Sequence, residues 1–239
     1  IWAIMANQAG LAALFFKWRF PQVKYILTLQ EGDSLWDIWL RTWFMRPLYK
    51  AIYRRADQTQ AISNFLAKRA KKLGAKGPVT VVPNGVDTGK FKVQSSKLKS
   101  ADEKSKIIIT TSRLVKKNGL KDLIKSLTYL PVEISLWVLG IGPEENYLRC
   151  LASKVGVVGR VKFLGQIDGL QIPEYLAKAD VFVRPSLSEG LGNSFLEAMA
   201  AGLPTVGTPV GGILDFLKAG ETGWLCEVKN PKSIAEQIK

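Results

Sequence analysis

The second half of the chain alternates short apolar runs with amphipathic segments of helical length. Runs such as KIIITTS, from residue 106, and DVFVRPS, from residue 180, are rich in β-branched residues and suit buried strands. Six such strand–helix alternations predict a mostly parallel sheet covered by helices, which is a doubly wound α/β domain. In such sheets a ligand binds beyond the carboxyl ends of the strands, so functional residues are expected directly after each run.

The first half carries a less regular version of the same pattern. Three of its runs predict strands, at residues 23–30, 56–63 and 79–85. Residues 92–106 are polar and lack apolar periodicity, which is typical of a connection between domains. We therefore predict a first domain over 1–91, a linker over 92–106 and a second domain over 107–239.

The first twenty residues are strongly apolar. Asn7, Gln8, Lys17 and Arg19 interrupt them, and no basic region precedes the apolar run. This favours a buried helix of an α/β domain over a membrane-spanning helix or a signal peptide. Because the chain starts at Ile1, directly inside this pattern, we expect it to be a fragment of a longer protein.

Composition excludes several classes of site. Histidine is absent and the two cysteines, Cys150 and Cys226, stand far apart, which rules out a Ser-His-Asp triad and argues against a zinc site or a disulfide framework. So few cysteines favour a reducing cytoplasm. The net charge of +14 favours anionic partners, although a generally basic, solvated surface explains it equally well. Residues 68–76, the densest basic stretch, lack the interleaved aromatic residues of a nucleic-acid groove, so no nucleic-acid partner is expected.

Cationic and small residues follow the strands of the second half. Arg113 comes after the first of these strands, where its guanidinium could fork onto a diphosphate, and Lys117 follows about one turn later. Gly140, Gly142 and Pro143 follow the next strand, where glycines let a ligand approach backbone N–H groups. A lone arginine after a strand is more often a simple surface residue, but its neighbours here predict a phosphate-bearing ligand.

Two glutamates stand eight positions apart near the end of the chain. Glu189 lies in a glycine-rich turn after a strand, and Glu197 is expected more than one turn inside a helix that begins near Gly192. The two carboxylates would then bind different parts of one ligand, with a helix N-terminus between them. The spacing alone also fits a helix-start carboxylate and a solvated helix residue. The flanking EAMAAGLPTVGTPVGG favours the ligand interpretation.

Together these motifs resemble the retaining glycosyltransferases of the GT-B architecture, family 4. PNGVDTGKF, TSRLVKKNGLKDLI, VLGIGPEENYL and FLGQIDGLQIPEYLAKADVFVRPS occur in the family's order, over roughly the whole chain. The resemblance implies an α/β fold of two Rossmann-like, doubly wound domains that face each other across a cleft. The first would bind the acceptor and the second the nucleotide-sugar donor. The first domain would be incomplete here.

The resemblance also implies roles for individual residues. Arg113 resembles the arginine that holds the donor diphosphate, Glu189 the glutamate near the donor sugar, and Glu197 the glutamate that binds ribose hydroxyls. The catalytic group would be Glu189, Arg113 and Lys117. The donor-binding group would be Glu197, Gly190, Leu191, Gly192, Asn193, Gly140, Gly142, Pro143 and Asn118.

Two departures from the family pattern accompany these roles. Asn118 stands where the family commonly has a lysine, and Gln30 stands near the place of a common histidine. The expected cleft loops contain no Asp-x-Asp, as in metal-independent members, so no metal or other cofactor is expected.

The implied activity is transfer of a hexose from a nucleotide sugar to a glycan or lipid-linked acceptor, with retention at the anomeric carbon, in cell-envelope polysaccharide or glycolipid assembly. A related but non-catalytic subunit that binds sugar nucleotides or glycans is the alternative. Peripheral contact with an anionic membrane face is a further expectation, through aromatic residues such as Trp36, Trp39 and Trp43. Tryptophans at this helical spacing are, however, more often part of a core.

Overall fold

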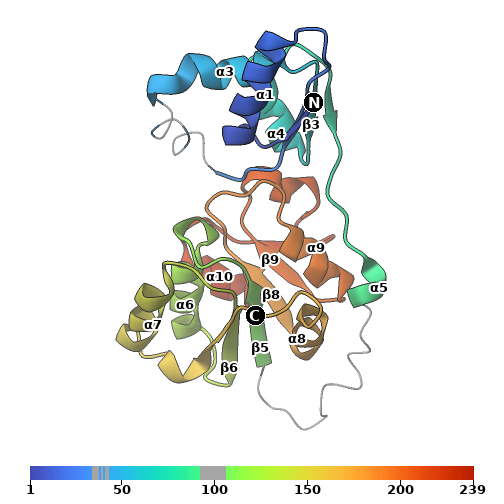
Figure 1. The fold of residues 1–239 in the computed structure, drawn as a ribbon. Helices are drawn as coiled ribbons and strands as arrows, with labels where there is room; N and C mark the ends of the chain where they lie inside the picture. The colour runs from blue at the N-terminus through green and yellow to red at the C-terminus, as the bar shows by residue number, and fades with distance from the viewer. Residues whose placement is uncertain (34–37, 39, 41–42, 92–105) are drawn as a thin grey trace. The chain divides into compact units, whose positions relative to one another are not determined.

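The computed structural model describes the chain except for residues 34–37, 39, 41–42 and 92–105. Its internal contacts divide it into two compact units, which are described separately (Figure 1). The first unit contains residues 1–84 with 188–191 and 211–215, and the second contains 85–187, 192–210 and 216–239. The linker expected over 92–106 lies outside the described residues, apart from Lys106.

The first unit is built on a parallel sheet with the strand order β1-β2-β3-β4. Its strands are β1 (Trp2–Ile4), β2 (Ile26–Leu29), β3 (Gln58–Ala61) and β4 (Val79–Val81). Its helices are α1 (Gln8–Arg19), α3 (Arg46–Arg55) and α4 (Asn64–Lys72), with 3-10 turns η1 (Trp43–Met45) and η6 (Gly211–Asp215). The three strands predicted from the sequence are thus confirmed, each shorter than its apolar run.

The opening segment differs from its expected form. It contains strand β1 before the helix α1, and the helix begins after Asn7, whose side chain accepts a hydrogen bond from the Ala9 N–H at 3.0 Å. Only one side of α1 is buried, whereas Phe15 is 52% exposed and Trp18 is 45% exposed. We expected a buried helix here, and this is wrong for the side of α1 that carries Phe15 and Trp18.

Exposed aromatic residues continue at η1. Trp43 is 67% exposed, so the expectation that it belongs to a core is wrong, while Trp36 and Trp39 lie outside the described residues. Among the helices that the structure describes, none combines the length and the apolar character needed to cross a membrane.

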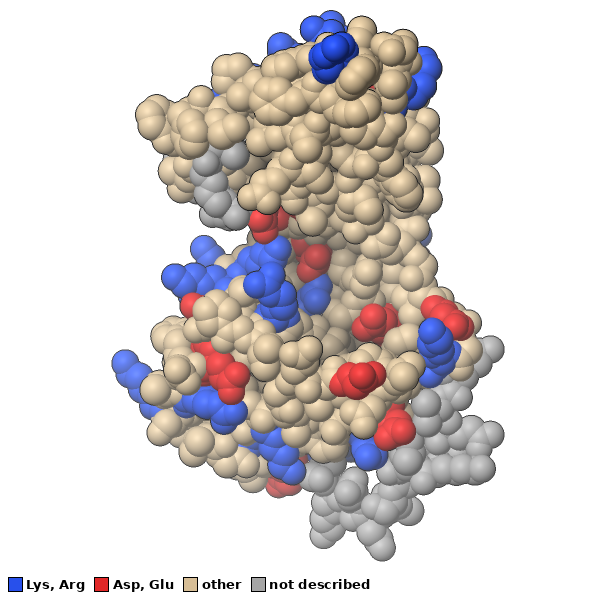
Figure 2. Space-filling view, viewed as in Figure 1, with Lys and Arg blue, Asp and Glu red and all other residues tan. Residues whose placement is uncertain are grey.

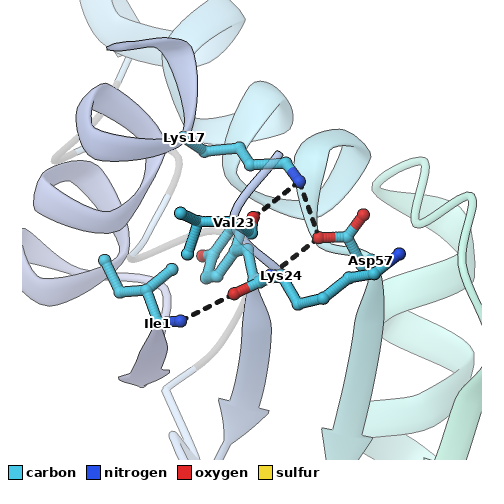
Figure 3. A network of polar contacts seen from close by, with 6 residues as sticks. Ile1, Lys17, Val23, Lys24 and Asp57 are labelled. Atoms are coloured by element: carbon cyan, nitrogen blue, oxygen red, sulfur yellow. Dashed lines mark hydrogen bonds and ion pairs between the residues drawn. The ribbon is translucent and has the colours of Figure 1, made fainter. Parts of the chain in front are cut away.

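A polar network fixes α1 to the amino ends of β2 and β3 (Figure 3). The Lys17 ammonium donates to the Val23 carbonyl and to the Asp57 carboxylate, both at 2.8 Å, and the same carboxylate oxygen accepts from the Tyr25 N–H at 2.7 Å. These two hydrogen bonds, the one from Lys17 first, lower the pKa of Asp57. The backbone nitrogen of Ile1 donates to the Lys24 carbonyl at 2.6 Å and joins β1 to the same corner.

The second unit is built on a six-stranded parallel sheet with the order β10-β9-β8-β5-β6-β7. Its strands are β5 (Lys106–Thr111), β6 (Ile134–Leu139), β7 (Val161–Gly165), β8 (Val181–Arg184), β9 (Thr205–Gly207) and β10 (Trp224–Leu225). With β5 as the first strand, this is the 3-2-1-4-5-6 order of dinucleotide-binding folds. The order reverses between β5 and β8, which pair directly. The carboxyl edge there is where this topology predicts a ligand.

Helices cover both faces of this sheet. One face carries α6 (Leu120–Ser126), α7 (Glu145–Lys154) and α10 (Pro231–Ile238), and the other carries α8 (Ile172–Lys178) and α9 (Asn193–Ala200) (Figure 1). The shorter elements are α5 (Thr88–Phe91), η3 (Lys116–Asn118), η4 (Leu127–Tyr129) and η5 (Val158–Arg160). Because both faces are covered, Ile107, Ile108 and Ile109 of β5 are all buried, which explains the unbroken apolar run in the sequence.

Candidate functional site

The segment after β5 presents Arg113 at the switch point of the sheet. The Arg113 side chain is exposed, whereas the next residue, Leu114, is fully buried and anchors the segment. Ser112 N–H donates to the Leu139 carbonyl, and Leu114 N–H donates to the Ile141 carbonyl, each at 3.0 Å. The loops after β5 and β6 are therefore held together by their backbones.

Two glycines make this close approach possible. Gly140 has φ 133°, and a Cβ at this position would overlap the Ser112 carbonyl. A Cβ on Gly142 would lie 2.6 Å from the Leu114 nitrogen, well inside van der Waals contact. Both glycines are thus required by loop packing, so their presence alone does not depend on a ligand. Pro143 follows them as an exposed residue.

The loops after β5, β6 and β7 line a cavity of about 380 Å³ at the carboxyl edge. We call it the switch-point cavity because β5 borders the switch point, although its lining residues lie on the β6 and β7 side. It brings together Arg113 and Gly140 from the predicted set. Its remaining walls include Ser112, Leu139, Ile141, Gln166, Ile167 and Ile172. The Gly140 N–H donates to the Gly165 carbonyl at 2.7 Å, which fixes the loop after β7. Sequence reasoning missed Gln166 and Ile167, although the carboxyl-edge rule applied one or two residues further would have found them.

Asn118 and Lys117 support the segment that carries Arg113. The Asn118 side chain is 6% exposed and donates from Nδ2 to the Arg113 carbonyl at 2.6 Å. The Lys117 carbonyl accepts from the Leu187 N–H at 2.6 Å and so connects η3 to the segment after β8. Asn118 therefore helps to fix the position of Arg113, because its side-chain amide donates to the Arg113 backbone carbonyl.

A buried arginine, Arg184, ends β8 below α9. It is 7% exposed, donates from Nη1 to Ser194 Oγ at 2.7 Å and from Nε to Ser186 Oγ at 3.2 Å, and lies 5.1 Å from the Phe195 ring centroid. Hydroxyls and an aromatic face thus contact its guanidinium, and the Glu197 carboxylate is near enough to interact with its charge. Sequence reasoning missed Arg184, because arginine is usually exposed and no motif marks this position.

Helix α9 begins at Asn193, between the two glutamates, as predicted. Gly192, with φ 100°, precedes it, and Asn193 is exposed at its first turn. Glu197 lies in the second turn and is half-buried, and no described residue hydrogen-bonds to its carboxylate. Burial raises the pKa of Glu197, and nearby Arg184 lowers it by a smaller amount. The role of Glu197 in binding the hydroxyls of a ligand stays a prediction.

We expect Glu197→Gln to stabilise the protein at high pH and not at low pH. A folded-state pKa above the unfolded one gives stability that is present at low pH and is lost as the pH rises through the folded pKa. Glutamine stays neutral, so the variant should melt above the wild type at pH 8 and no higher at pH 4, as measured by thermal unfolding. The exposed Glu221→Gln is the matched control. A difference independent of pH would contradict burial as the cause.

The remaining predicted residues, Glu189, Gly190 and Leu191, belong to the first unit, unlike Arg113 and Glu197. The Glu189 carboxylate accepts from the Gly190 N–H at 3.0 Å, and its carbonyl accepts from the Gly212 N–H at 3.3 Å. Gly190 and Leu191 are buried.

Gln30, at the end of β2, lies against the segment that carries Glu189. A Cβ on Gly190 would lie 3.0 Å from the Gln30 carbonyl oxygen. Ser188 Oγ donates to the nearby Gly32 carbonyl at 2.5 Å. The backbone on both sides of Glu189 is therefore fixed within the first unit.

The chain matches two protein families over nearly its whole length. The family described as Glycosyl transferases group 1 matches residues 92–239, and Glycosyltransferase Family 4 matches residues 4–90. The lipopolysaccharide core biosynthesis glycosyltransferase LpsE of Rhizobium meliloti (strain 1021) is 33% identical over 234 residues, which cover 91% of this chain and 68% of that protein. The GDP-mannose-dependent alpha-(1-6)-phosphatidylinositol monomannoside mannosyltransferase of Mycobacterium tuberculosis (strain ATCC 25618 / H37Rv) is 28% identical over 250 residues, covering 96% of this chain and 63% of that protein.

Solved structures share the fold. Sucrose-phosphate synthase from Thermosynechococcus elongatus superposes with a TM-score of 0.87 at 22% identity, covering 100% of this chain and 63% of that one. HepE of Anabaena in complex with UDP and glucose gives a TM-score of 0.83 at 21% identity, covering 98% and 66%. These likenesses confirm the expected GT-B class of α/β fold. The chain spans about half to two thirds of the length of the curated relatives it matches.

Proposed function

The chain belongs to the family 4 glycosyltransferases, and on that premise we propose that it moves a hexose from a nucleotide-sugar donor to a glycan or lipid-linked acceptor. Transfer proceeds with retention at the anomeric carbon, needs no metal, and serves cell-envelope polysaccharide or glycolipid assembly. The relatives named for lipopolysaccharide core and phosphatidylinositol mannoside synthesis support this class of acceptor.

The observation that carries the donor half of this proposal is the switch-point cavity with Arg113 in its wall. A strand order of 3-2-1-4-5-6 predicts a nucleotide at the carboxyl edge beside β5, and the cavity adjoins this edge on the side of β6 and β7. The cavity offers one guanidinium and the backbone of three loops, and its volume of about 380 Å³ suits part of a nucleoside diphosphate. The guanidinium forks onto a diphosphate through paired N–H groups. Glu197 on α9 would accept ribose hydroxyls.

The chemistry follows from charge development. Breaking the bond between the sugar and the phosphate leaves negative charge on the diphosphate and positive charge on the sugar. Fixed cations and N–H donors at the leaving group stabilise that transition state. Arg113 and Lys117 supply the cations, and the N–H groups of Gly192 and Asn193 at the start of α9 supply donors. Glu189 faces the positive charge on the sugar in this proposal, and Gly142 with Pro143 borders the nucleotide.

Thermal unfolding with UDP, GDP and ADP and their sugar conjugates tests the proposal. One nucleoside diphosphate should raise the melting temperature, because a ligand at one hundred times its Kd stabilises the folded state by about 2.7 kcal/mol. Absence of any shift in a folded sample would contradict donor binding. Nucleotide binding without sugar transfer to any glycan acceptor would favour a non-catalytic binding subunit.

We further propose peripheral contact with an anionic membrane, on the cytoplasmic side, through the first unit. Phe15, Phe16 and Trp18 of α1 and Trp43 of η1 are exposed, and α3 ends in the exposed Arg54 and Arg55. Aromatic and basic side chains together suit a lipid interface.

Co-sedimentation with vesicles that contain phosphatidylglycerol checks this membrane proposal. The double variant Phe15→Ser and Trp18→Ser should release the protein from the vesicles, whereas Tyr129→Ser in the second unit should not. Equal retention of both variants would contradict contact through α1.

A further inference from the structure

A second cavity, of about 550 Å³, lies in the second unit beside the helices α6, α7 and α10. Three lysines from separate segments line it, so we call it the lysine cavity. Lys116 comes from η3, Lys121 from α6 and Lys229 from the turn before α10. Lys and Arg side chains gather over α6 and the segment before it in Figure 2. Cations that are distant in sequence thus converge on one concave surface.

The charge of this cavity is predominantly positive. Glu144 is the only acidic residue among the described residues that line it. Within the part of the chain that the structure describes, Lys116, Lys121 and Lys229 form no ion pair with a carboxylate. The nearby Asp122 is buried, and burial raises its pKa, while Lys121, Lys125 and Lys229 lower it. The ammonium groups of Lys121 and Lys229, which come from two different segments, therefore both lie close enough to Asp122 to lower its pKa.

The backbone holds Lys229 in an unusual conformation at the rim. Its φ of 59° is left-handed, which costs a residue with a Cβ about 1 kcal/mol. The next residue, Asn230, accepts hydrogen bonds from the Lys232 and Ser233 N–H groups, each at 3.1 Å, and so caps α10. The position of the Lys229 backbone is therefore fixed by the helix that follows it.

The lysine cavity is distinct from the switch-point cavity. The two share no lining residue. Leu114, which is fully buried, separates them: its N–H donates to Ile141 at the switch-point side, and its carbonyl accepts from the Glu144 N–H at the lysine side, each at 3.0 Å. An anion in the lysine cavity would thus not occupy the proposed donor site.

We propose that the lysine cavity binds the phosphate group of a small phosphate monoester. The three ammonium groups supply charge-assisted hydrogen bonds to the phosphate oxygens. Tyr147, which is 50% exposed, and the apolar side chains of Leu120 and Leu187 contact the body of the ligand. The volume is large enough for a phosphorylated sugar or for the glycerol phosphate end of a lipid. This inference does not depend on the proposed transfer reaction.

Isothermal titration with glucose 6-phosphate and with dioctanoyl phosphatidic acid tests the proposal and separates a soluble ligand from a lipid. Unphosphorylated glucose is the ligand control. The double variant Lys121→Ala and Lys229→Ala should weaken binding of the phosphate ester by about 100-fold, since each lost charged hydrogen bond costs about tenfold. The double variant Lys154→Ala and Lys178→Ala removes the same charge elsewhere in the second unit and should change affinity less than about twofold.

The Arg113→Ala variant should bind the phosphate ester as the wild type does. The proposal is supported if either ester binds and its binding depends on Lys121 and Lys229. The ester that binds with higher affinity shows whether the phosphate belongs to a soluble ligand or to a lipid. The proposal fails if neither ester binds, if both lysine pairs weaken binding equally, or if Arg113→Ala weakens it as strongly as the cavity pair. Circular dichroism melting of each variant confirms that it remains folded.

Discussion

Replacing Arg113 by alanine should weaken nucleoside diphosphate binding by about 10- to 100-fold, because a hydrogen bond to a charged group contributes about 1.5 to 3 kcal/mol. Arg113 is exposed in the wall of the switch-point cavity, and its own carbonyl is held by Asn118. The backbone should therefore keep its shape when the guanidinium is removed. Titration calorimetry with the nucleotide that stabilises the wild type measures the effect.

Two further variants separate charge from geometry at this position. Arg113→Lys keeps the positive charge but loses the paired N–H groups, so its affinity should fall between those of wild type and alanine. Arg149→Ala is the matched control, since that guanidinium is engaged with Glu145 on α7 at 2.8 Å and does not line the cavity. If Arg149→Ala weakened nucleotide binding as much as Arg113→Ala, the effect would be one of net charge and the assigned site would be wrong.

Replacing Glu189 by glutamine should reduce sugar transfer by about 100- to 1000-fold, which is the usual effect of removing one group that stabilises a transition state. Nucleotide affinity should change less than about twofold, because the proposed partner of Glu189 is the sugar and not the diphosphate. The carboxylate oxygen that accepts from the Gly190 N–H can be replaced by the amide oxygen of glutamine, so the turn should be preserved. Transfer rates at saturating donor, together with nucleotide titration, separate the two effects.

Glu221→Gln serves as the control for Glu189, since Glu221 is an exposed residue paired with Lys218 at 3.5 Å. Unchanged transfer in Glu189→Gln would contradict a role at the reacting sugar. A matching loss of nucleotide affinity would instead place this carboxylate, or the turn that carries it, at the donor phosphates.

The sequence predicted the second unit better than the first. The apolar runs of the second unit are strands buried on both faces, so their pattern is strong. Arg113 and Gly140, which follow the carboxyl ends of two of them, line one cavity. In the first unit β1 has only three residues, and α1 is apolar on its exposed side as well. Periodicity cannot separate a buried side from an exposed one when both are apolar, which is why the exposure of Phe15 and Trp18 was not foreseen.

The roles of the predicted site residues stay predictions, and sequence reasoning missed the side chains that support them. Motif reasoning identifies residues by type and place after a strand, so it found Glu197 and the start of α9. It could not find the hydroxyl partners of Arg184, because Ser194 lies ten positions away and meets it only through the packing of α9 on β8. The same holds for the amide of Asn118, whose acceptor is a backbone group that carries no sequence signal.

The amide of Asn118 also constrains substitution at its own position. It donates to the Arg113 carbonyl from a site that is 6% exposed, and a lysine placed there alone would bring an ammonium into a space shaped for an amide. The difference from the common family residue is therefore contingent on its surroundings. We therefore expect that Asn118→Lys would require neighbouring residues to shift, so that this position and the loop around it depend on each other.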